Sequence, residues 1–267
     1  MVSLKRDSKG NFKEATGIRS RRSSIYTSGQ NEVFKISRSK FSNFLNCKRC
    51  FYLDRVKGLQ EPSMPGWSLN TTVDDLLKKE FDYYRAKKEP HPIFKKYNLN
   101  FIPYVHEEID NWRNSLSGGI SYLDEDTNII LQGGVDDVWF NLDTQELVIC
   151  DYKAQSTSYE VEKETYLNGV YHQGYKIQMD IYVYIMRQMG FKVSDISYFM
   201  VCNGIKSANS FNAKMNFDIS LIDYKVEIDW VKEKILEMKK TMDSNQIPEK
   251  TPHCENCAYL EQGSHFF

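Results

Sequence analysis

Two Cys-x-x-Cys pairs near opposite ends of the chain constrain its fold more than any other feature of the sequence. Cys47 and Cys50 form the first pair, Cys254 and Cys257 form the second, and residues 51–253 lie between them. Four thiolates in two such pairs are typical of a tetrahedral Zn²⁺ site or of a [4Fe–4S] cluster. If the pairs meet, they join the N- and C-terminal segments of one fold.

The compartment decides how these cysteines are interpreted. The first ten residues lack the apolar stretch of a secretory signal, and no window approaches the ~20 apolar residues of a membrane span. We therefore expect a cytoplasmic protein without a membrane partner, in which disulfides do not persist. Metal binding is favoured over four ordinary thiols. His253 adjoins Cys254 and is a further candidate ligand, whereas Cys150 and Cys202 fall in or at the end of predicted strands and are expected to pack in a core.

Charge is unevenly distributed along the chain. Residues 1–40 hold ten Lys or Arg and three Asp or Glu, whereas the whole chain has a net charge of -1. A basic arm joined to an acidic body suits contact with phosphate groups, and a solvated tail is the alternative. We predict a flexible arm over residues 1–34 and one domain over 35–267, which is long enough to bury a core.

The hydrophobic pattern predicts an α/β fold, with a mixed central sheet flanked by helices. The first predicted helix starts at an N-cap, Ser37 or Ser39, and carries the first cysteine pair at its end; the second starts at Thr71 or Thr72 and ends near Tyr84. Further helices are predicted over 102–116, 174–189 and 226–242, and strands over 129–140, 146–153, 196–202 and 216–224.

A hairpin is predicted over residues 133–153. If its turn is centred on residues 143–144, Trp139 lies opposite Val148, and the neighbouring opposed residues are also apolar. Apolar pairs on both faces support this register and indicate a sheet that is covered on both sides.

The same register brings charged residues together at one end of the hairpin. Asp136 lies opposite Asp151, with their Cβ atoms about 4.5–5.5 Å apart, and Lys153 faces the same side as Asp151. Two buried carboxylates this close repel each other, and Mg²⁺ or Mn²⁺ would remove the repulsion. Such an ion can polarise a phosphodiester and activate water, while Lys153 orients the water or stabilises charge on phosphate. A plain ion pair at a strand end is the alternative.

Gln178 and Tyr182 are four residues apart in the predicted helix over 174–189, so they share a helix face. If that face points to the end of the sheet, the pair can hydrogen-bond Lys153, a water or a phosphate. Tyr182 considered alone is more often a core residue.

Taken together, these motifs resemble the PD-(D/E)XK nuclease superfamily, and within it the RecB-like and CRISPR-associated exonuclease branch. The resemblance covers about residues 37–260 and includes both cysteine pairs. It rests on Gly134-Val-Asp136, Asp151-Tyr-Lys153, Gln178-x-x-x-Tyr182 and the stretch Cys47-Lys-Arg-Cys50-Phe-Tyr-Leu53.

The resemblance implies a restriction-endonuclease-like core and a metal-dependent DNA nuclease that acts in repair, recombination or defence. It implies DNA as substrate, as single strands or duplex ends, and a helicase or other repair protein as a partner. The implied catalytic residues are Asp136, Asp151, Lys153, Gln178 and Tyr182; the implied metal ligands are Asp136, Asp151 and the Tyr152 carbonyl.

The sequence departs from this pattern in three places. The proline of the "PD" motif is absent. Asp74 stands where the branch carries a histidine ligand; it is a candidate ligand, or it interacts with the positive N-terminus of a helix, with Glu80 as the fallback ligand. The branch holds an iron–sulfur cluster with one early and three late cysteines, whereas this chain has two and two. The choice between Zn²⁺ and [4Fe–4S] therefore stays open.

Two other functions remain open at this stage. A catalytically inactive nucleic-acid-binding module with the same fold would bind DNA without turnover. A structural protein built around a four-thiolate metal centre would bind neither DNA nor Mg²⁺.

Overall fold

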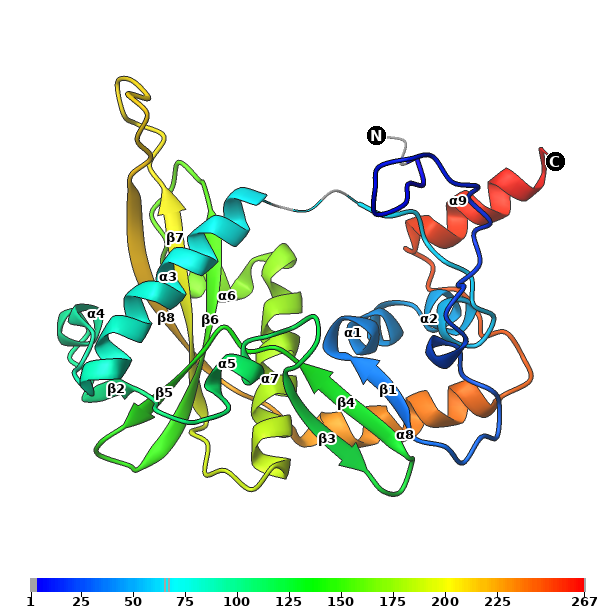
Figure 1. The fold of residues 1–267 in the computed structure, drawn as a ribbon, viewed down its shortest axis with the longest axis horizontal. Coiled ribbons are helices and arrows are strands. Elements are labelled where there is room, and N and C mark those ends of the chain that lie inside the picture. Colours follow the sequence, from blue (N-terminus) through cyan, green and yellow to red (C-terminus); the bar gives the residue numbers. More distant parts are fainter. Residues whose placement is uncertain (1–3, 65, 67, 267) are drawn as a thin grey trace. The chain divides into compact units, whose positions relative to one another are not determined.

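The computed structural model describes residues 4–64, 66 and 68–266. The chain divides into two compact units. The first contains residues up to 66, residues 123–130 and residues from 232 onward; the second contains residues 67–122 and 131–231. Figure 1 labels the helices and strands of both units.

The first unit joins segments from both ends of the chain. Its β1 is linked to the turn between β3 and β4, because Phe34 N donates to Asn128 O at 2.9 Å. The strand order of this sheet is β1-β4-β3. The elements that lie in this unit wholly or in part are η1 (Arg22–Ser24), β1 (Phe34–Ser37), α1 (Arg38–Asn46), α2 (Lys48–Arg55), β3 (Ile120–Asp124), β4 (Ile129–Gly133), α8 (Asp229–Asp243) and α9 (Glu255–Ser264).

The start of α1 follows the sequence prediction. Ser37 caps the helix, since its Oγ accepts a hydrogen bond from Lys40 N at 3.4 Å. The helix ends at Asn46, and Cys47 has an extended backbone between α1 and α2. The sequence had predicted that Cys50 lies at the end of the first helix. This prediction is wrong, because Cys50 lies in α2.

The predicted N-terminal arm has little regular structure, but its second half is held in place. Arg19 forms an ion pair with the buried Asp54 of α2. Tyr26 donates its hydroxyl proton to Asp243 Oδ1 of α8 at 2.6 Å, and Ser28 donates to the Asp243 carbonyl at 2.6 Å. Residues 1–3 of the predicted arm lie outside the described residues.

The second unit is built on a five-stranded mixed sheet with the order β2-β5-β6-β7-β8. Only β6 and β7 pair in parallel within this order, and α6 and α7 form part of the crossover between them. Its elements are α3 (Ser68–Lys87), α4 (Pro92–Lys96), β2 (Phe101–Pro103), α5 (Ile109–Trp112), β5 (Asp137–Asn141), β6 (Glu146–Gln155), α6 (Lys163–Asn168), η2 (Val170–His172), α7 (Gln173–Gln188), β7 (Ile196–Gly204) and β8 (Phe217–Lys225).

The predicted hairpin register is confirmed. Trp139 pairs with Val148, and the neighbouring pairs follow the same register. The ladder begins at Asp137 opposite Cys150, so Asp136 stands one residue before β5. Gly134 is required in the approach to β5, because a Cβ there would lie 2.8 Å from the Ser115 backbone.

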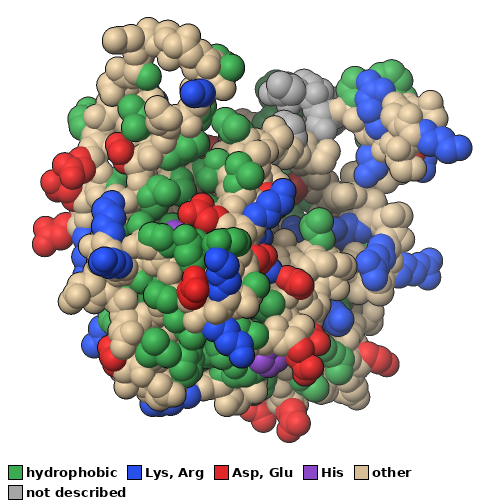
Figure 2. All heavy atoms as spheres, turned by 60° about the vertical axis from the view of Figure 1, so that its left-hand side comes forward, with side chains coloured by type: hydrophobic (Ala, Val, Ile, Leu, Met, Phe, Trp, Pro, Cys, Tyr) green, Lys and Arg blue, Asp and Glu red, His purple; other side chains and the backbone are tan. Residues whose placement is uncertain are grey.

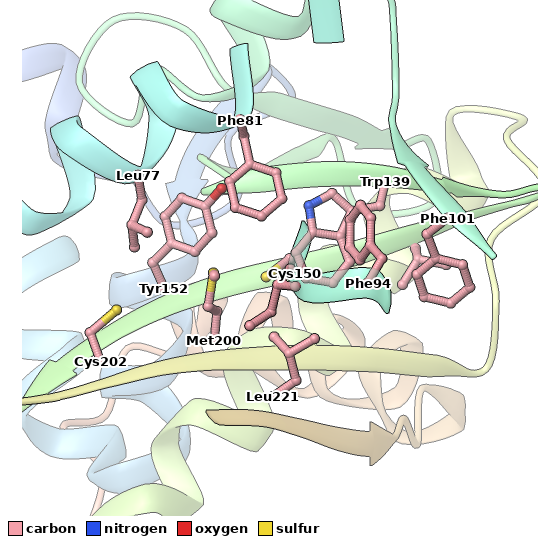
Figure 3. Close-up of a cluster of buried hydrophobic side chains, with 12 residues drawn as sticks. Leu77, Phe81, Phe94, Phe101, Trp139, Cys150, Tyr152, Met200, Cys202 and Leu221 are labelled. Carbon is pink, nitrogen blue, oxygen red and sulfur yellow. The ribbon is translucent and has the colours of Figure 1, made fainter. Parts of the chain in front are cut away.

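A buried aromatic cluster covers one face of this sheet (Figure 3). Phe81 of α3 stacks on Trp139 of β5 with ring centroids 5.6 Å apart. Cys150 and Cys202 belong to this cluster and are at most 2% exposed, as the sequence predicted. α7 contributes buried side chains to the other face, so the sheet is covered on both sides.

Three sequence predictions are corrected. The helix predicted over 102–116 is wrong: Phe101–Pro103 forms the edge strand β2 against β5, and only α5 is helical. The strand predicted over 129–140 is divided into β4 and β5. α3 starts at Ser68, before either predicted cap residue. None of the described helices is both long and apolar enough to span a membrane.

Candidate active site

Two aspartates of the candidate site meet at β6: Asp151 is part of this strand, and Asp136 contacts its backbone. Asp151 lies within β6 and is fully buried. Asp136 Oδ2 accepts a hydrogen bond from Tyr152 N at 2.7 Å, which holds this carboxylate against β6. Because side chains alternate along a strand, Asp151 and Lys153 share one face and Tyr152 points to the other.

Lys153 is held from three sides. Its ammonium forms an ion pair with Asp151 and donates to Gln178 Oε1 at 3.5 Å. The same nitrogen lies 4.4 Å from the centre of the Tyr175 ring, a cation–π contact. Tyr175 was not predicted as a site residue. It lies one helical turn before Gln178 on α7, and this spacing could have indicated that both side chains face the site.

α7 completes the cluster with the pair that the sequence singled out. Gln178 Nε2 donates to Asp151 Oδ1 at 2.6 Å and to the Tyr182 hydroxyl at 3.0 Å. Gln178 and Tyr182 are at most 8% exposed. The helix face that carries them therefore does point to the charged end of the hairpin.

The charges in this cluster shift one another's pKa values. Burial, and then the neighbouring Asp151, raise the pKa of Asp136 well above its usual value, although Lys153 opposes them. For Lys153 itself burial lowers the pKa, but Asp151 and Asp136 outweigh burial and the net shift is upward. Lys153 is therefore charged at neutral pH. Its single positive charge cannot neutralise both Asp136 and Asp151 when both carboxylates are ionised.

A cavity of about 580 Å³ opens onto this cluster and includes Asp74. Asp74 Oδ2 accepts from Lys78 at 2.7 Å. Because α3 begins at Ser68, Asp74 lies in the second helical turn, beyond the reach of the N-terminal partial charge. The helix-terminus interpretation of Asp74 is thus not supported. Glu80, the fallback ligand, instead contacts His91 Nε2 at 2.8 Å and does not line the cavity.

The chemistry of these donors fits a hard divalent cation. Three carboxylates and the Tyr152 carbonyl supply the oxygen ligands that Mg²⁺ and Mn²⁺ prefer. Among the described residues, Asp74 Oδ1 and Asp151 Oδ2 are buried without a hydrogen-bond partner, although the latter contacts the Lys153 ammonium. Such orphaned anionic oxygens are costly unless a cation satisfies them.

A second buried aspartate supports the hairpin from the opposite face. Asp137 is fully buried and forms an ion pair with Arg85 of α3. It also accepts from the Tyr152 hydroxyl at 2.9 Å and from Trp139 Nε1 at 3.3 Å. Sequence reasoning missed this network. Asp137 fixes the side chain of the same Tyr152 whose backbone holds Asp136.

The four cysteines gather in the first unit. Cys50 Sγ lies 3.4 Å from the sulfurs of both Cys254 and Cys257, and Cys47 Sγ lies 3.7 Å from that of Cys257. All four sulfurs lie within 4.8 Å of one another, the one such group of metal-binding side chains in the described part of the chain. Asp74, Asp136 and Asp151 are not gathered this tightly. Four sulfurs at 2.3 Å from one tetrahedral ion would be about 3.8 Å apart.

This arrangement confirms that the two cysteine pairs meet. Burial opposes ionisation of Cys47. Backbone hydrogen bonds from Cys50 and Thr251, together with the thiols of Cys254 and Cys257, outweigh burial and lower the pKa of Cys47 to about 6. Burial raises the pKa of Cys257 to about 11. His253 is exposed and does not belong to the group.

Comparison with protein-family profiles identifies the class of this protein. The sequence profile of the PD-(D/E)XK nuclease superfamily matches residues 64–262. The chain therefore belongs to the PD-(D/E)XK nuclease superfamily. A crystal structure of a protein from Eubacterium rectale, described as a "Putative exonuclease", is similar with a TM-score of 0.41 and 14% sequence identity, covering 89% of this chain and 88% of that chain. A search of curated proteins found no match.

Proposed function

We propose that this protein is a divalent-metal-dependent nuclease that hydrolyses phosphodiester bonds in DNA. The observation that carries the proposal is a cavity lined by Asp74, Asp136 and Lys153, in a chain of this superfamily. The Lys153 ammonium also forms an ion pair with the fully buried Asp151. A reaction in repair, recombination or defence, with a helicase or other repair protein as partner, is part of the same proposal.

The proposed metal ligands are carboxylates of Asp74, Asp136 and Asp151 and the carbonyl of Tyr152. Bound Mg²⁺ or Mn²⁺ supplies positive charge for the phosphate and lowers the pKa of a bound water. Burial of Asp136 next to Asp151 supports this assignment, because their repulsion is relieved when a cation is shared.

The remaining residues act on the water and the phosphate. Lys153 donates a proton of its ammonium as a hydrogen bond to the attacking water or to a phosphate oxygen, and its charge stabilises the pentavalent phosphorus. Gln178 orients Asp151 through the bond to Oδ1, and Tyr182 holds the Gln178 amide. The oxygen of water bonds to phosphorus as the bond to the leaving nucleotide oxygen breaks; the water loses a proton to solvent, and the leaving oxygen takes one up from solvent.

Outside the acidic site, the thiol centre formed by Cys47, Cys50, Cys254 and Cys257 is proposed to hold Zn²⁺ or a [4Fe–4S] cluster with a structural role. The sulfur spacing suits a single tetrahedral ion, whereas a cluster requires the sulfurs to move apart. Basic residues of the arm over residues 1–34 are proposed to contact DNA phosphates.

A cleavage assay tests the nuclease proposal. Purified protein is incubated with single-stranded and duplex DNA in Mg²⁺, Mn²⁺ or a chelator. We expect cleavage with either metal and none with chelator. Asp151→Asn and Lys153→Met should abolish cleavage, whereas Lys163→Met should retain it, because Lys163 forms an exposed ion pair with Asp223 in the same unit. Binding without cleavage by the wild type would instead favour the inactive module.

A further inference from the structure

A long connection follows β7 and takes no part in the strand pairing of the sheet. Residues 205–216, here called the ribbon, connect β7 to β8 and extend beyond the sheet (Figures 1 and 2). Because β6 and β7 are parallel, the ribbon leaves the sheet at the end toward which Lys153 and the following loop of β6 also run. Lys153 pairs with Val201, three residues before β7 ends at Gly204.

The tip of the ribbon carries an exposed aromatic residue and a lysine on either side of a tight turn. Lys214 N donates to Phe211 O at 2.8 Å, and Asn212 and Ala213 between them have φ of 41° and 55°. Two consecutive left-handed residues form the type I′ turn of a tight hairpin, which places the flanking residues opposite each other. Phe211 is 71% exposed, and Lys214 is exposed beside it.

The charge of the ribbon has a single sign. Lys206 and Lys214 lie in it, and residues 205–216 contain no Asp or Glu; most of the others are Ser, Asn or Ala. A small-residue loop would close this hairpin without Phe211, and an exposed Phe does not stabilise the fold. Its combination with lysines is typical of a surface that binds unpaired nucleotides, because rings stack on bases and lysines contact phosphates.

A second exposed aromatic residue faces the same region. Thr157 N donates to Asn203 Oδ1 at 2.8 Å, and the Thr157 hydroxyl donates to Tyr159 O at 2.9 Å. These bonds anchor the loop after β6 to the end of β7, yet the Tyr159 side chain is 84% exposed. A ring that is presented from an anchored loop loses little entropy when a ligand binds.

The loop and the ribbon enclose a cavity of about 650 Å³. Tyr159 and Lys206 line it, and Lys96 from α4 contributes a third side chain. Glu160 and Asp218 also line it, so phosphate contact is expected at the ribbon rather than at these two acids.

We propose that the ribbon and Tyr159 bind the unpaired nucleotides of a DNA strand whose scissile phosphate lies near Lys153. This inference rests on the proposed function. Three residues of β7 span about 10 Å, which is at most about three nucleotides, since 3.4 Å is the rise per nucleotide in a duplex and an unpaired strand is more extended. Phe211 lies seven residues beyond Gly204, so a strand of up to roughly ten nucleotides is needed to reach the tip. In a duplex, the faces of each base are covered by stacking on its neighbours and cannot stack on Phe211 or Tyr159. The ribbon should therefore prefer single strands.

Binding of oligo(dT) of 4 and 12 nucleotides, measured by fluorescence anisotropy without divalent metal, tests the inference. Phe211→Ala should weaken binding of the 12-mer about tenfold, within the range of one stacked base, and leave the 4-mer unchanged. Tyr159→Ala should weaken both. Phe211→Trp should retain affinity for the 12-mer, and so should the control Leu116→Ala, which removes a 96% exposed side chain elsewhere in the same unit.

Hydrolysis of bis(p-nitrophenyl) phosphate separates this inference from the nuclease proposal, since so small a diester cannot reach the ribbon. Phe211→Ala should hydrolyse it at the wild-type rate. If the wild type binds the 12-mer through Phe211 but cleaves neither DNA nor this diester, the nuclease proposal fails, and only the binding of unpaired nucleotides by the ribbon stands. Equal 12-mer affinity of wild type and Phe211→Ala overturns the inference. Equally effective competition by polyglutamate, which offers charge without bases, also overturns it.

Discussion

The two polar clusters of this molecule are assembled in opposite ways. The thiol centre consists of four identical side chains drawn from segments about 200 residues apart, and no charge balance is possible among thiolates alone. The acidic site draws carboxylates, an amide and an ammonium from β6, the residue before β5 and α7. One cluster is chemically uniform, and the other has a different group at each position.

This difference teaches what each cluster can do. Four thiolates need a bound metal to balance their charge, and the metal then joins distant segments of the first unit. The acidic site already contains a cation, Lys153, which neutralises part of its charge, so its geometry depends less on an added ion. We therefore expect loss of the thiol centre to affect stability first, and loss of the acidic site to affect catalysis first.

Replacing one thiol should have the largest effect. Cys50→Ser leaves three thiols, so the protein should lose its bound metal and the first unit should unfold more easily, by as much as about 10 kcal/mol if the centre resembles a structural zinc site. Metal analysis and thermal unfolding measure this. Cys202→Ser, which changes a buried cysteine outside the group, should keep the metal. Unchanged metal content in Cys50→Ser would refute the four-thiol assignment.

Removing the ammonium of the acidic site should lower activity instead. Lys153→Met should lower kcat/KM for DNA cleavage by roughly 10²–10³, the cost of one missing group that stabilises transition-state charge. Its metal content at the thiol centre should match that of the wild type. A variant that cleaves at the wild-type rate would show that Lys153 is merely the partner of a buried aspartate.

Features that depend on local sequence patterns were predicted correctly more often than features that depend on contacts between distant segments. The Trp139–Val148 register was predictable because several consecutive opposed residues are apolar. The cysteine group was predictable because two Cys-x-x-Cys pairs in one chain are typical of a shared metal site. The helix predicted over 102–116 was wrong, because Phe101–Pro103 gains more by pairing with the open edge of β5 than its local pattern suggests.

Partners that meet only in three dimensions had no signal in the sequence. Arg85 and Asp137 lie 52 residues apart, and nothing in either segment shows that they pair. The contact of Lys153 with Tyr175 depends on where α7 crosses β6, which helical periodicity does not specify. These residues support the candidate site rather than define its motif, which is why pattern reasoning passed over them.

A pH experiment tests a buried carboxyl group of α7 that lies outside the acidic site. On α7, burial raises the pKa of Asp180 to about 6, against the hydrogen bonds it accepts from Glu227 N, the Tyr224 hydroxyl and Trp230 Nε1. The folded state therefore binds the proton of the Asp180 carboxyl more tightly than the unfolded state, in which the pKa of this group is near 3.8. Asp180 thus favours folding increasingly as pH falls from 7 to 4, by up to about 3 kcal/mol.

Asp180→Asn should remove this pH-dependent increment. Urea unfolding of wild type and variant at pH 7 and pH 4.5 measures it as the change in their stability difference. If that difference is the same at both pH values, Asp180 is ionised in the folded protein.

The smallest expected effect comes from the network behind the hairpin. Tyr152→Phe removes a hydrogen bond to the buried Asp137 and should cost about 2 kcal/mol of unfolding free energy. Activity should change only a few fold, because the Tyr152 backbone remains. Tyr166→Phe is the matched control, since the buried Tyr166 hydroxyl has no hydrogen-bond partner among the described residues, and its loss should be nearly neutral. Equal destabilisation by both variants would contradict the proposed support.

Calorimetric titration with Mn²⁺ tests most directly whether two aspartates share a hard cation. The wild type should bind Mn²⁺ with the thiol centre already loaded, and Asp136→Asn should lose this binding. If the wild type binds no Mn²⁺, or if Asp136→Asn binds it with wild-type affinity, the acidic cluster is an ion pair within the fold, and the assignment of a metal-dependent active site is wrong.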